Sequence, residues 1–241
     1  EKVEQEVHRL FPEARTLRMD RDTTSKKNSH EQILESFGRG DADILIGTQM
    51  IVKGHDFSRV TLVGVLLADL TLFSGDYRAG ERTFDLLTQA AGRAGRGDVP
   101  GKVVIQTYKP DNYAITAAAS QDYRAFYDIE EAYRSLMRYP PEWNMMVIMG
   151  TGMDEEQLAN IMDRMYSLIR GKYINAGHLS VIGPSEPAIS KIKDVYRRVL
   201  YIKHRDYRML VDVKDYVEEW LKENGESDVS VFFDMNPVNM Y

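Results

Sequence analysis

The chain has 241 residues, of which 43% are hydrophobic and 28% charged, a balance typical of globular proteins with one large or two ordinary domains. It contains no cysteine, which excludes a disulfide framework and a thiolate zinc site. No apolar run approaches the roughly 18 residues of a membrane helix, and no signal-peptide pattern is present, so we expect a cytoplasmic protein without a membrane partner. The net charge of -6 argues against a globally basic nucleic-acid binder, although local charge decides binding.

Residues 1–111 read as alternating helices and strands. Apolar positions take helical spacing from the first residues, which predicts a helix over 1–11 and a fragment of a longer protein. Strands are expected near 15–20, 42–48, 60–69 and 101–107, and further helices near 28–39 and 78–91. The runs "ADILIGT" and "VTLVGVLLAD" are typical of parallel strands covered on both faces, so we expect an α/β sheet.

Residues 112–141 form a helical connector that stops at Pro140–Pro141, and residues 142–241 form a second domain. Strands near 144–150, 178–183, 195–204 and 228–236 and helices near 154–172 and 207–224 give the order βαββαβ, typical of a ferredoxin-like fold. Asp154 is the expected N-cap of the first of these helices. Its predicted apolar face comprises Leu158, Ile161, Met162, Met165 and Ile169. Met145, Met146 and Met149 are expected in the core as well.

The stretch "TQAAGRAGRGD", residues 88–98, sets Arg93 and Arg96 three apart among small residues, after Gln89. Gly92 and Gly95 allow close backbone approach, and two arginines three apart on a helix, or on its frayed end, are expected to point the same way. Guanidinium groups suit phosphate oxygens, so the pair could clamp a terminal phosphoryl group. A solvated basic turn at a helix end is the alternative interpretation.

The stretch "DILIGTQMIVKGHDF", residues 43–57, joins a strand to a polar loop. Ligands of open α/β sheets bind outside the carboxyl ends of the strands. Thr48, Gln49 and Lys53 could therefore contact phosphates, and Asp56 could accept a hydrogen bond from a ribose hydroxyl. Asp56 could equally be a turn or cap residue.

Taken together, the two stretches resemble motifs V and VI of superfamily-2 helicases, whose motif VI reads Q-x-x-G-R-x-G-R. Gln89, Gly92, Arg93, Gly95 and Arg96 match it fully. Four segments are similar to the primosomal protein N′ (PriA) family of replication-restart helicases: "RMDRDTT", "ILIGTQMIVKGHDF", "DYRAGERTFDLLTQAAGRAGRG" and "IGPSEPAISKIKDVYRRVLYIK". The resemblance covers essentially the whole chain. It implies most of a second RecA-like helicase lobe, N-terminally truncated, followed by a C-terminal DNA- or partner-binding domain.

The resemblance further implies an ATP-dependent 3′–5′ DNA helicase that acts at abandoned replication forks and restarts replication by primosome assembly. Arg93 and Arg96 would contact the γ-phosphate of ATP, with Arg96 as the arginine finger, and Gln89 would couple the nucleotide to the lobes. The other implied contacts are Gly54 and Asp56 to ATP, and Thr48, Gln49 and Lys53 to DNA. Single-stranded and forked DNA, single-strand-binding protein and primosome proteins are the implied partners, in the nucleoid-associated cytoplasm of a bacterium.

The chain also departs from the family. It contains neither a G-x-x-x-x-G-K-[ST] loop nor a D-E-x-H motif, so ATP and Mg²⁺ would be held mainly by a first lobe that this sequence lacks. We therefore expect the chain alone not to hydrolyse ATP. The family's cysteine-rich zinc insertion would lie upstream, or the protein would be a zinc-free variant. "YPPEWN" lacks the aromatic residue expected directly after the two prolines.

Residues 190–208 are strongly basic. The seven cations are Lys191, Lys193, Arg197, Arg198, Lys203, Arg205 and Arg208, against two acids, Asp194 and Asp206. Such local charge, interleaved with tyrosines, predicts DNA contact, with Lys191, Lys193, Arg197 and Arg198 as the candidate residues. A solvated edge strand protected by lysines is the alternative.

Two other functions stay open. The chain could be a non-enzymatic DNA- or protein-binding module with a relic helicase lobe, or part of a translocase that acts on RNA. His55, His178 and His204 are scattered and have no cysteine partners, so we expect structural roles for them and no metal site in this chain.

Overall fold

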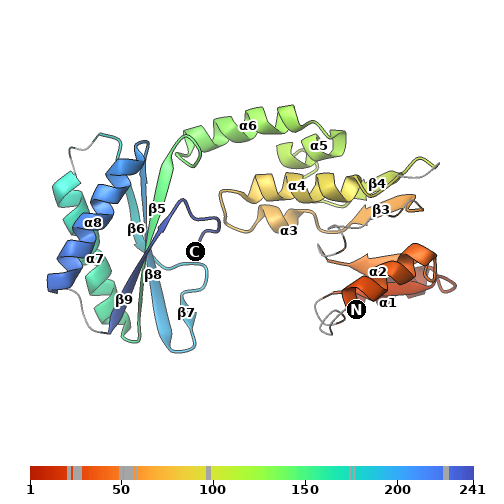
Figure 1. Cartoon of the computed structure of the whole chain (residues 1–241), viewed down its shortest axis with the longest axis horizontal. Coiled ribbons are helices and arrows are strands. Elements are labelled where there is room, and N and C mark those ends of the chain that lie inside the picture. The colour runs from red at the N-terminus through yellow and green to blue at the C-terminus, as the bar shows by residue number, and fades with distance from the viewer. Residues whose placement is uncertain are drawn as a thin grey trace. The chain divides into compact units, whose positions relative to one another are not determined.

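The computed structural model describes the chain except for residues 21–22, 24–28, 49–50, 52–56, 58, 96–98, 174, 176 and 225–227. The chain divides into two compact units (Figure 1). Unit 1 comprises residues 1–74 and 79–126, and unit 2 comprises residues 75–78 and 127–241. The three-part domain division 1–111, 112–141 and 142–241 stays a prediction. No helix among the described residues is long and apolar enough to cross a membrane.

The first part of unit 1 is a parallel strand pair with two helices. It contains α1 (Lys2–Leu10), β1 (Thr16–Met19), α2 (Ser29–Arg39) and β2 (Ile44–Gly47). The strands β1 and β2 run parallel, with Met19 opposite Gly47 at their carboxyl ends. Parallel neighbours need a crossover connection, which α2 supplies. Met19 of β1 and Leu34 of α2 are buried, so the core of this part lies around these two side chains.

The second part of unit 1 repeats the arrangement. It contains β3 (Leu62–Val65), α3 (Asp69–Leu72), α4 (Ala79–Ala91), β4 (Lys102–Ile105) and α5 (Tyr113–Ser120), and β3 runs parallel to β4. Its core joins Phe84 and Leu87 of α4 to the small buried side chains of α5 and to Phe126. The rings of Phe84 and Phe126 stack with their centroids 4.3 Å apart. The predicted α/β class is confirmed.

Two details of the predicted sheet are wrong. The described residues form two separate two-stranded parallel sheets, and the strands are not covered on both faces, because Leu62 of β3 is 60% exposed. The strand expected over 60–69 ends at Val65, since Leu67 takes a left-handed backbone (φ 52°) and α3 begins at Asp69. The buried Asp69 carboxylate accepts hydrogen bonds from the Thr107 hydroxyl (2.7 Å) and the Tyr108 N–H (2.9 Å), which hold this turn.

The helical segment expected over 112–141 is two helices. The helix α5 is capped by Asn112, whose side chain accepts a hydrogen bond from the Ala114 N–H at 3.0 Å. It ends at a left-handed Gln121 (φ 54°), and α6 (Tyr123–Leu136) follows. The boundary between the units falls within α6, after Phe126.

Unit 2 is an antiparallel sheet with two helices on one face (Figure 1). Its elements are β5 (Asn144–Gly152), α7 (Glu155–Tyr173), β6 (Ser180–Ser185), β7 (Lys191–Ile192), β8 (Val195–His204), α8 (Tyr207–Asn224) and β9 (Val229–Met235). The strand order is β6-β8-β5-β9, and β7 pairs with β8. Asp154 caps α7, since its carboxylate accepts a hydrogen bond from the Gln157 N–H at 3.0 Å, as predicted. The predicted face of α7 and the methionines of β5 are buried, so these predictions are confirmed.

The helix-free face of this sheet is also packed. Val147, Met149 and Val199 form a small core there with Tyr201 and Tyr241. The Tyr201 hydroxyl donates a hydrogen bond to the Tyr241 carbonyl at 3.1 Å, which holds the last residues of the chain against the sheet.

Residues 75–78 belong to unit 2, where the Tyr77 side chain packs. This side chain is buried, stacks on the Tyr139 ring with centroids 5.0 Å apart, and donates a hydrogen bond from its hydroxyl to the Pro237 carbonyl at 3.2 Å. Asp76 adds a second contact, because its carboxylate accepts a hydrogen bond from the Met240 N–H at 3.4 Å. The short segment between α3 and α4 is therefore anchored beside the C-terminal residues.

Candidate functional site

The helix α4 positions Gln89 and Arg93. Its inner face buries Phe84, Leu87 and Ala90, and Gln89 is exposed. The helix ends at Ala91, but its last turn continues tightly, since the Arg93 N–H donates to the Ala90 carbonyl at 3.1 Å. Arg93 therefore follows Gln89 by about one turn and is half-buried at the end of the helix.

The residues after Arg93 are fixed by a close crossing of two glycines. Gly95 has a left-handed backbone (φ 75°), and a Cβ atom on it would overlap the backbone of Gly101. A Cβ on Gly101 would likewise overlap Gly95. The Gly95 N–H donates to the Val60 carbonyl at 3.0 Å, and the Lys102 N–H donates to the Thr61 carbonyl at 2.8 Å. Both ends of this loop are thus bound to the chain just before β3.

Two parts of the sequence interpretation need correction here. Because α4 ends at Ala91 and Gly95 is left-handed, the helical repeat does not continue from Arg93 to Arg96, so helical spacing does not make them point the same way. Gly95 does allow close backbone approach, but no close contact requires a glycine at position 92. A Cβ on Gly92 would meet the Thr88 carbonyl at 3.5 Å, an ordinary contact. Arg96 itself lies outside the described residues.

The second predicted stretch begins at the carboxyl end of β2. Thr48 is exposed there, and its carbonyl accepts a hydrogen bond from the Ile51 N–H at 3.2 Å. Gly47 passes so close to β1 that a Cβ on it would lie 2.5 Å from the Met19 carbonyl oxygen. The remaining candidates of this stretch, Gln49, Lys53, Gly54 and Asp56, lie outside the part of the chain that the structure describes.

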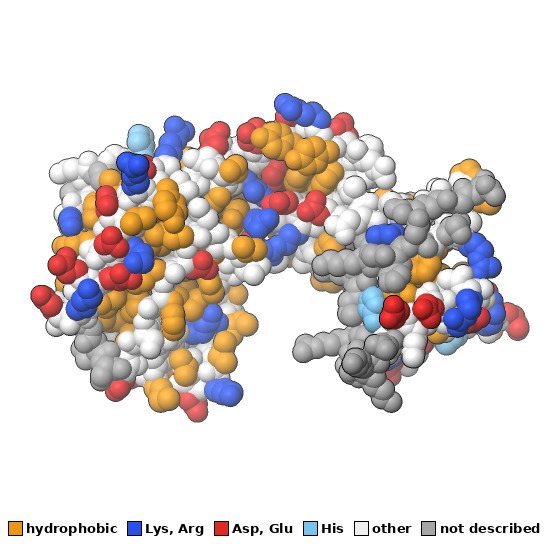
Figure 2. All heavy atoms as spheres, in the orientation of Figure 1, with side chains coloured by type: hydrophobic (Ala, Val, Ile, Leu, Met, Phe, Trp, Pro, Cys, Tyr) orange, Lys and Arg blue, Asp and Glu red, His pale blue; other side chains and the backbone are white. Residues whose placement is uncertain are grey.

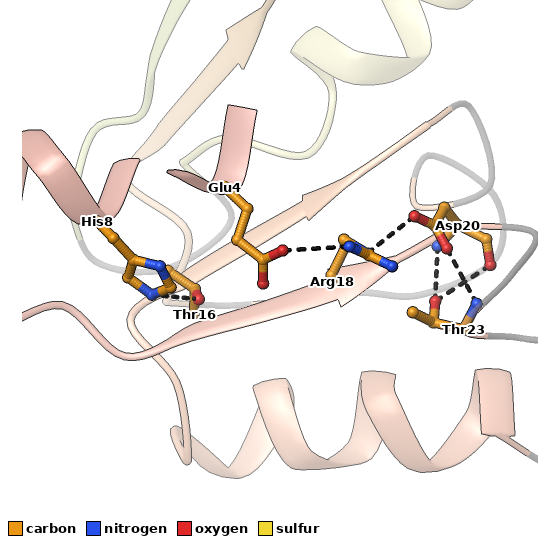
Figure 3. Close-up of polar contacts among 6 residues, drawn as sticks. All are labelled: Glu4, His8, Thr16, Arg18, Asp20 and Thr23. Atoms are coloured by element: carbon orange, nitrogen blue, oxygen red, sulfur yellow. Dashed lines mark hydrogen bonds and ion pairs between the residues drawn. The ribbon is translucent and has the colours of Figure 1, made fainter. Parts of the chain in front are cut away.

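A polar cluster that the sequence analysis missed lies at the same sheet edge (Figure 3). Asp20 follows β1 directly, as Thr48 follows β2. The Asp20 N–H donates to the Thr23 hydroxyl at 2.9 Å, and the Thr23 N–H donates back to the Asp20 carboxylate at 3.0 Å. The Arg18 guanidinium pairs with Asp20 at 2.9 Å and with Glu4 of α1 at 3.3 Å. The D-x-x-T spacing in "DRDTTSK", interpreted only as a polar loop, was the signal for this turn.

The four basic candidates on and beside β8 do not share one face. Successive strand residues point to opposite faces of a sheet. Arg198 points to the helix face and lies 3.7 Å from Glu155, whereas Arg197 points to the other face and donates to the Ile189 carbonyl at 3.2 Å. Lys191 donates to the Tyr196 hydroxyl at 3.2 Å. The expectation of one concentrated basic region is therefore wrong, and the visible surface of unit 2 carries basic and acidic side chains intermixed (Figure 2).

Lys203 is not a surface cation. Its side chain points to the helix-free face and is 5% exposed. The ammonium group donates to the Met137 carbonyl at 3.2 Å and lies 3.5 Å from the centre of the Tyr139 ring. Burial, with a smaller contribution from the charge of Arg138, lowers the pKa of Lys203 to about 8.

The described histidines make structural contacts. The His178 ring lies edge-on to Trp143, with centroids 6.4 Å apart, and a His204 ring nitrogen lies 3.1 Å from the Gly177 carbonyl. Among the residues that the structure describes, no group of three His, Cys, Asp or Glu side chains could hold a metal ion. His55 lies outside them.

Comparison with known proteins matches each half of the chain to a different family model. Residues 2–98 match the helicase conserved C-terminal domain, and residues 135–238 match the primosomal protein N C-terminal domain. The replication restart protein PriA of Bacillus subtilis (strain 168) is 42% identical over 242 aligned residues, which are 100% of this chain and 30% of the relative.

Two further replication restart proteins PriA align over 100% of this chain. The protein of Chlamydia trachomatis is 38% identical, with 32% of its length covered, and that of Synechocystis is 35% identical, with 28% covered. The chain thus spans about a third of the length of the curated relatives that it matches. On these two domains and this full-length alignment, the chain belongs to the PriA family of replication restart proteins.

Proposed function

We propose that this chain is part of an ATP-dependent 3′–5′ DNA helicase that recognises stalled or abandoned replication forks and restarts replication by primosome assembly. The observation that carries the proposal is the end of α4. Gln89 and Arg93 lie on one helix end, and the glycine crossing of Gly95 and Gly101 fixes the base of the loop that contains Arg96. This part of the chain lies within the match to the helicase model.

In the proposed mechanism, Arg93 and Arg96 contact the γ-phosphate of ATP, with Arg96 as the arginine finger. Guanidinium groups held in place before the reaction stabilise the charge that develops on the transferred phosphoryl group. Gln89 couples the nucleotide to the lobes. The residues after β2 complete the site, with Gly54 and Asp56 at the nucleotide and Thr48, Gln49 and Lys53 at the DNA.

ATP and Mg²⁺ would be held mainly by a helicase lobe outside this chain, since neither a phosphate-binding loop nor a D-E-x-H motif occurs in it. Zinc would belong to an insertion outside this chain. We therefore propose that the chain alone is inactive as an ATPase. The wider protein would work in the bacterial cytoplasm, associated with the nucleoid, together with single-strand-binding protein and primosome proteins.

We further propose that unit 2 is a ferredoxin-like domain that binds DNA or partner proteins. The strand order β6-β8-β5-β9, with antiparallel neighbours and both helices on one face, supports this description. Lys191, Lys193, Arg197 and Arg198 stay candidate DNA contacts. Because these four residues do not share one face of the sheet, each would contribute to DNA binding separately.

The test is DNA-stimulated ATP hydrolysis by the full-length protein with Arg96→Ala, with Arg93→Ala, and with the exposed Arg9→Ala as a control. An arginine finger contributes about 10³–10⁵ in rate, so Arg96→Ala should lose nearly all activity while the control retains it. Normal turnover in Arg96→Ala would refute the assignment. No activity in the full-length wild type would instead favour the non-enzymatic binding module.

A further inference from the structure

A shallow hollow lies where the turn after α6 meets the edge strand β6. It has a volume of about 280 Å³ and is lined by Arg138, Arg170, Tyr173, Leu179, Ser180 and Val181. Arg138 has a left-handed backbone (φ 57°) and an exposed side chain. The hollow is therefore lined by two arginines and a serine.

The indole of Trp143 supports Arg138, which lines this hollow, and a second arginine, Arg205. Trp143 is 5% exposed, and the guanidinium carbons of Arg138 and Arg205 lie 5.0 Å and 5.4 Å from its ring centre. A cation over an aromatic face is held in place while its charge is not neutralised. The two arginines are thus positioned, yet keep their full charge. We call Arg138, Trp143, Arg170 and Arg205 the Trp143 patch.

The cations of the Trp143 patch lack carboxylate partners among the described residues. Arg170 donates to the Tyr166 hydroxyl at 3.0 Å, a neutral group. Two acids lie nearby without pairing with these arginines. Asp206 accepts a hydrogen bond from the Arg208 N–H at 2.9 Å, and burial, followed by the charge of Asp212, raises the pKa of Tyr173, which lines the hollow. Other arginines of the chain are paired, among them Arg15 with Asp43, Arg39 with Asp41 and Arg134 with Glu130. Lys203, buried behind the patch, adds a further cation without a carboxylate partner in the described chain.

We propose that the Trp143 patch binds the phosphodiester backbone of a nucleic-acid strand, an inference that rests on the proposed DNA-binding function of unit 2. Guanidinium forks match phosphate oxygens, and the separate origins of the three arginines, after α6, in α7 and after β8, suit a ligand with repeated charges. Because Trp143 is buried, it does not stack on a base. The patch therefore binds phosphates without reading sequence.

The test measures how binding depends on salt. Anisotropy of a fluorescent oligo(dT) gives the affinity of the chain over a series of NaCl concentrations, for wild type, Arg138→Gln/Arg205→Gln and Lys2→Gln/Lys222→Gln. Each lost phosphate contact on a single strand reduces the slope of log affinity against log salt by about 0.7. The patch variant should therefore lose about 1.4 from the slope, while the control, with the same charge change on two exposed lysines, keeps it.

Circular dichroism checks that the variants are folded, and Arg138→Lys/Arg205→Lys separates charge from packing. This variant retains both cations, so its slope should match the wild type. An unchanged slope in the folded Gln variant would overturn the proposal. The proposal would also be overturned if the Gln variant lost binding to an acidic peptide while its salt slope on DNA stayed unchanged, because the patch would then bind a protein partner. If the wild-type chain itself does not bind DNA, the DNA-binding role of unit 2 fails as well, whereas the ATPase test of Arg96 is independent.

Discussion

Raising the pH should stabilise unit 2, because Lys203 is buried as a cation. Its folded-state pKa is about 8, against 10.5 for an exposed lysine. Between these values the unfolded chain binds more protons than the folded one, so the free energy of unfolding rises with pH in this window. Below about pH 8 the full penalty is present, and the difference in pKa corresponds to about 3 kcal/mol.

The window between pH 7 and 9.5 is suitable for the measurement. About 2 kcal/mol of the penalty should be relieved there. Burial raises the pKa values of Tyr139 and Tyr201 above their usual 10, so their ionisation in the unfolded chain lowers stability only as the pH approaches 10, and it does so in both proteins alike. The variant Lys203→Met keeps an unbranched side chain of similar length but has no charge. Its stability should therefore be nearly independent of pH between these limits.

Urea unfolding of wild type and Lys203→Met, followed by tryptophan fluorescence, provides the assay. Both tryptophans, Trp143 and Trp220, belong to unit 2, so the signal reports that unit alone. Loss of the hydrogen bond to the Met137 carbonyl affects the variant equally at every pH and does not enter the comparison. Equal pH dependence in both proteins, or a wild type that loses stability towards pH 9.5, would refute the assignment of a buried cation.

Three further predictions follow from packing. Asp69→Asn should lower the melting temperature at pH 7 and reduce the loss of stability in acid. The hydrogen bond from the Tyr108 N–H lowers the pKa of Asp69, so the carboxylate's contribution to stability disappears as the pH falls through that pKa. Equal acid sensitivity of the variant and the wild type in thermal unfolding would contradict this. Met162→Ala should cost about 2–5 kcal/mol in urea unfolding, because the side chain is fully buried, and a loss below 1 kcal/mol would disagree. Gly101→Ala should lower the free energy of unfolding by about 1–3 kcal/mol or more, whereas Gly92→Ala should be as stable as wild type. Equal melting temperatures of the two variants would show that the crossing of Gly95 and Gly101 does not require a glycine.

The sequence predicted unit 2 more closely than unit 1, for a physical reason. The bounds expected for β8 (195–204) and α8 (207–224) are those observed, because their strand and helix patterns are long and end at turn residues. The apolar face of α7, from Leu158 to Ile169, was predicted as well. Long patterns of this kind bury a continuous face, so local periodicity and tertiary packing agree.

The misses are places where a contact distant in sequence decides the local structure. The apolar run 60–69 has strand composition throughout, but hydrogen bonds from Thr107 and Tyr108 to Asp69 turn its end into α3. Composition also counted Lys203 among the seven cations of residues 190–208, whereas its place on β8 buries it with its ammonium group 3.5 Å from the centre of the Tyr139 ring. A count of charges carries no information about strand faces, and the same limit applied to Arg197 and Arg198.

The three glycines around the predicted arginine pair have different physical explanations. Gly95 and Gly101 are needed by the chain itself, because any Cβ atom would overlap the other residue's backbone. Gly92 has ordinary room for a Cβ, so packing within the described chain does not require a glycine there. When the fold does not require a glycine at a position, the close approach of another molecule or of another part of the protein can explain why a small residue stands there. In the proposed helicase, the nucleotide between the lobes is that neighbour, and a Cβ on Gly92 would then affect catalysis rather than folding.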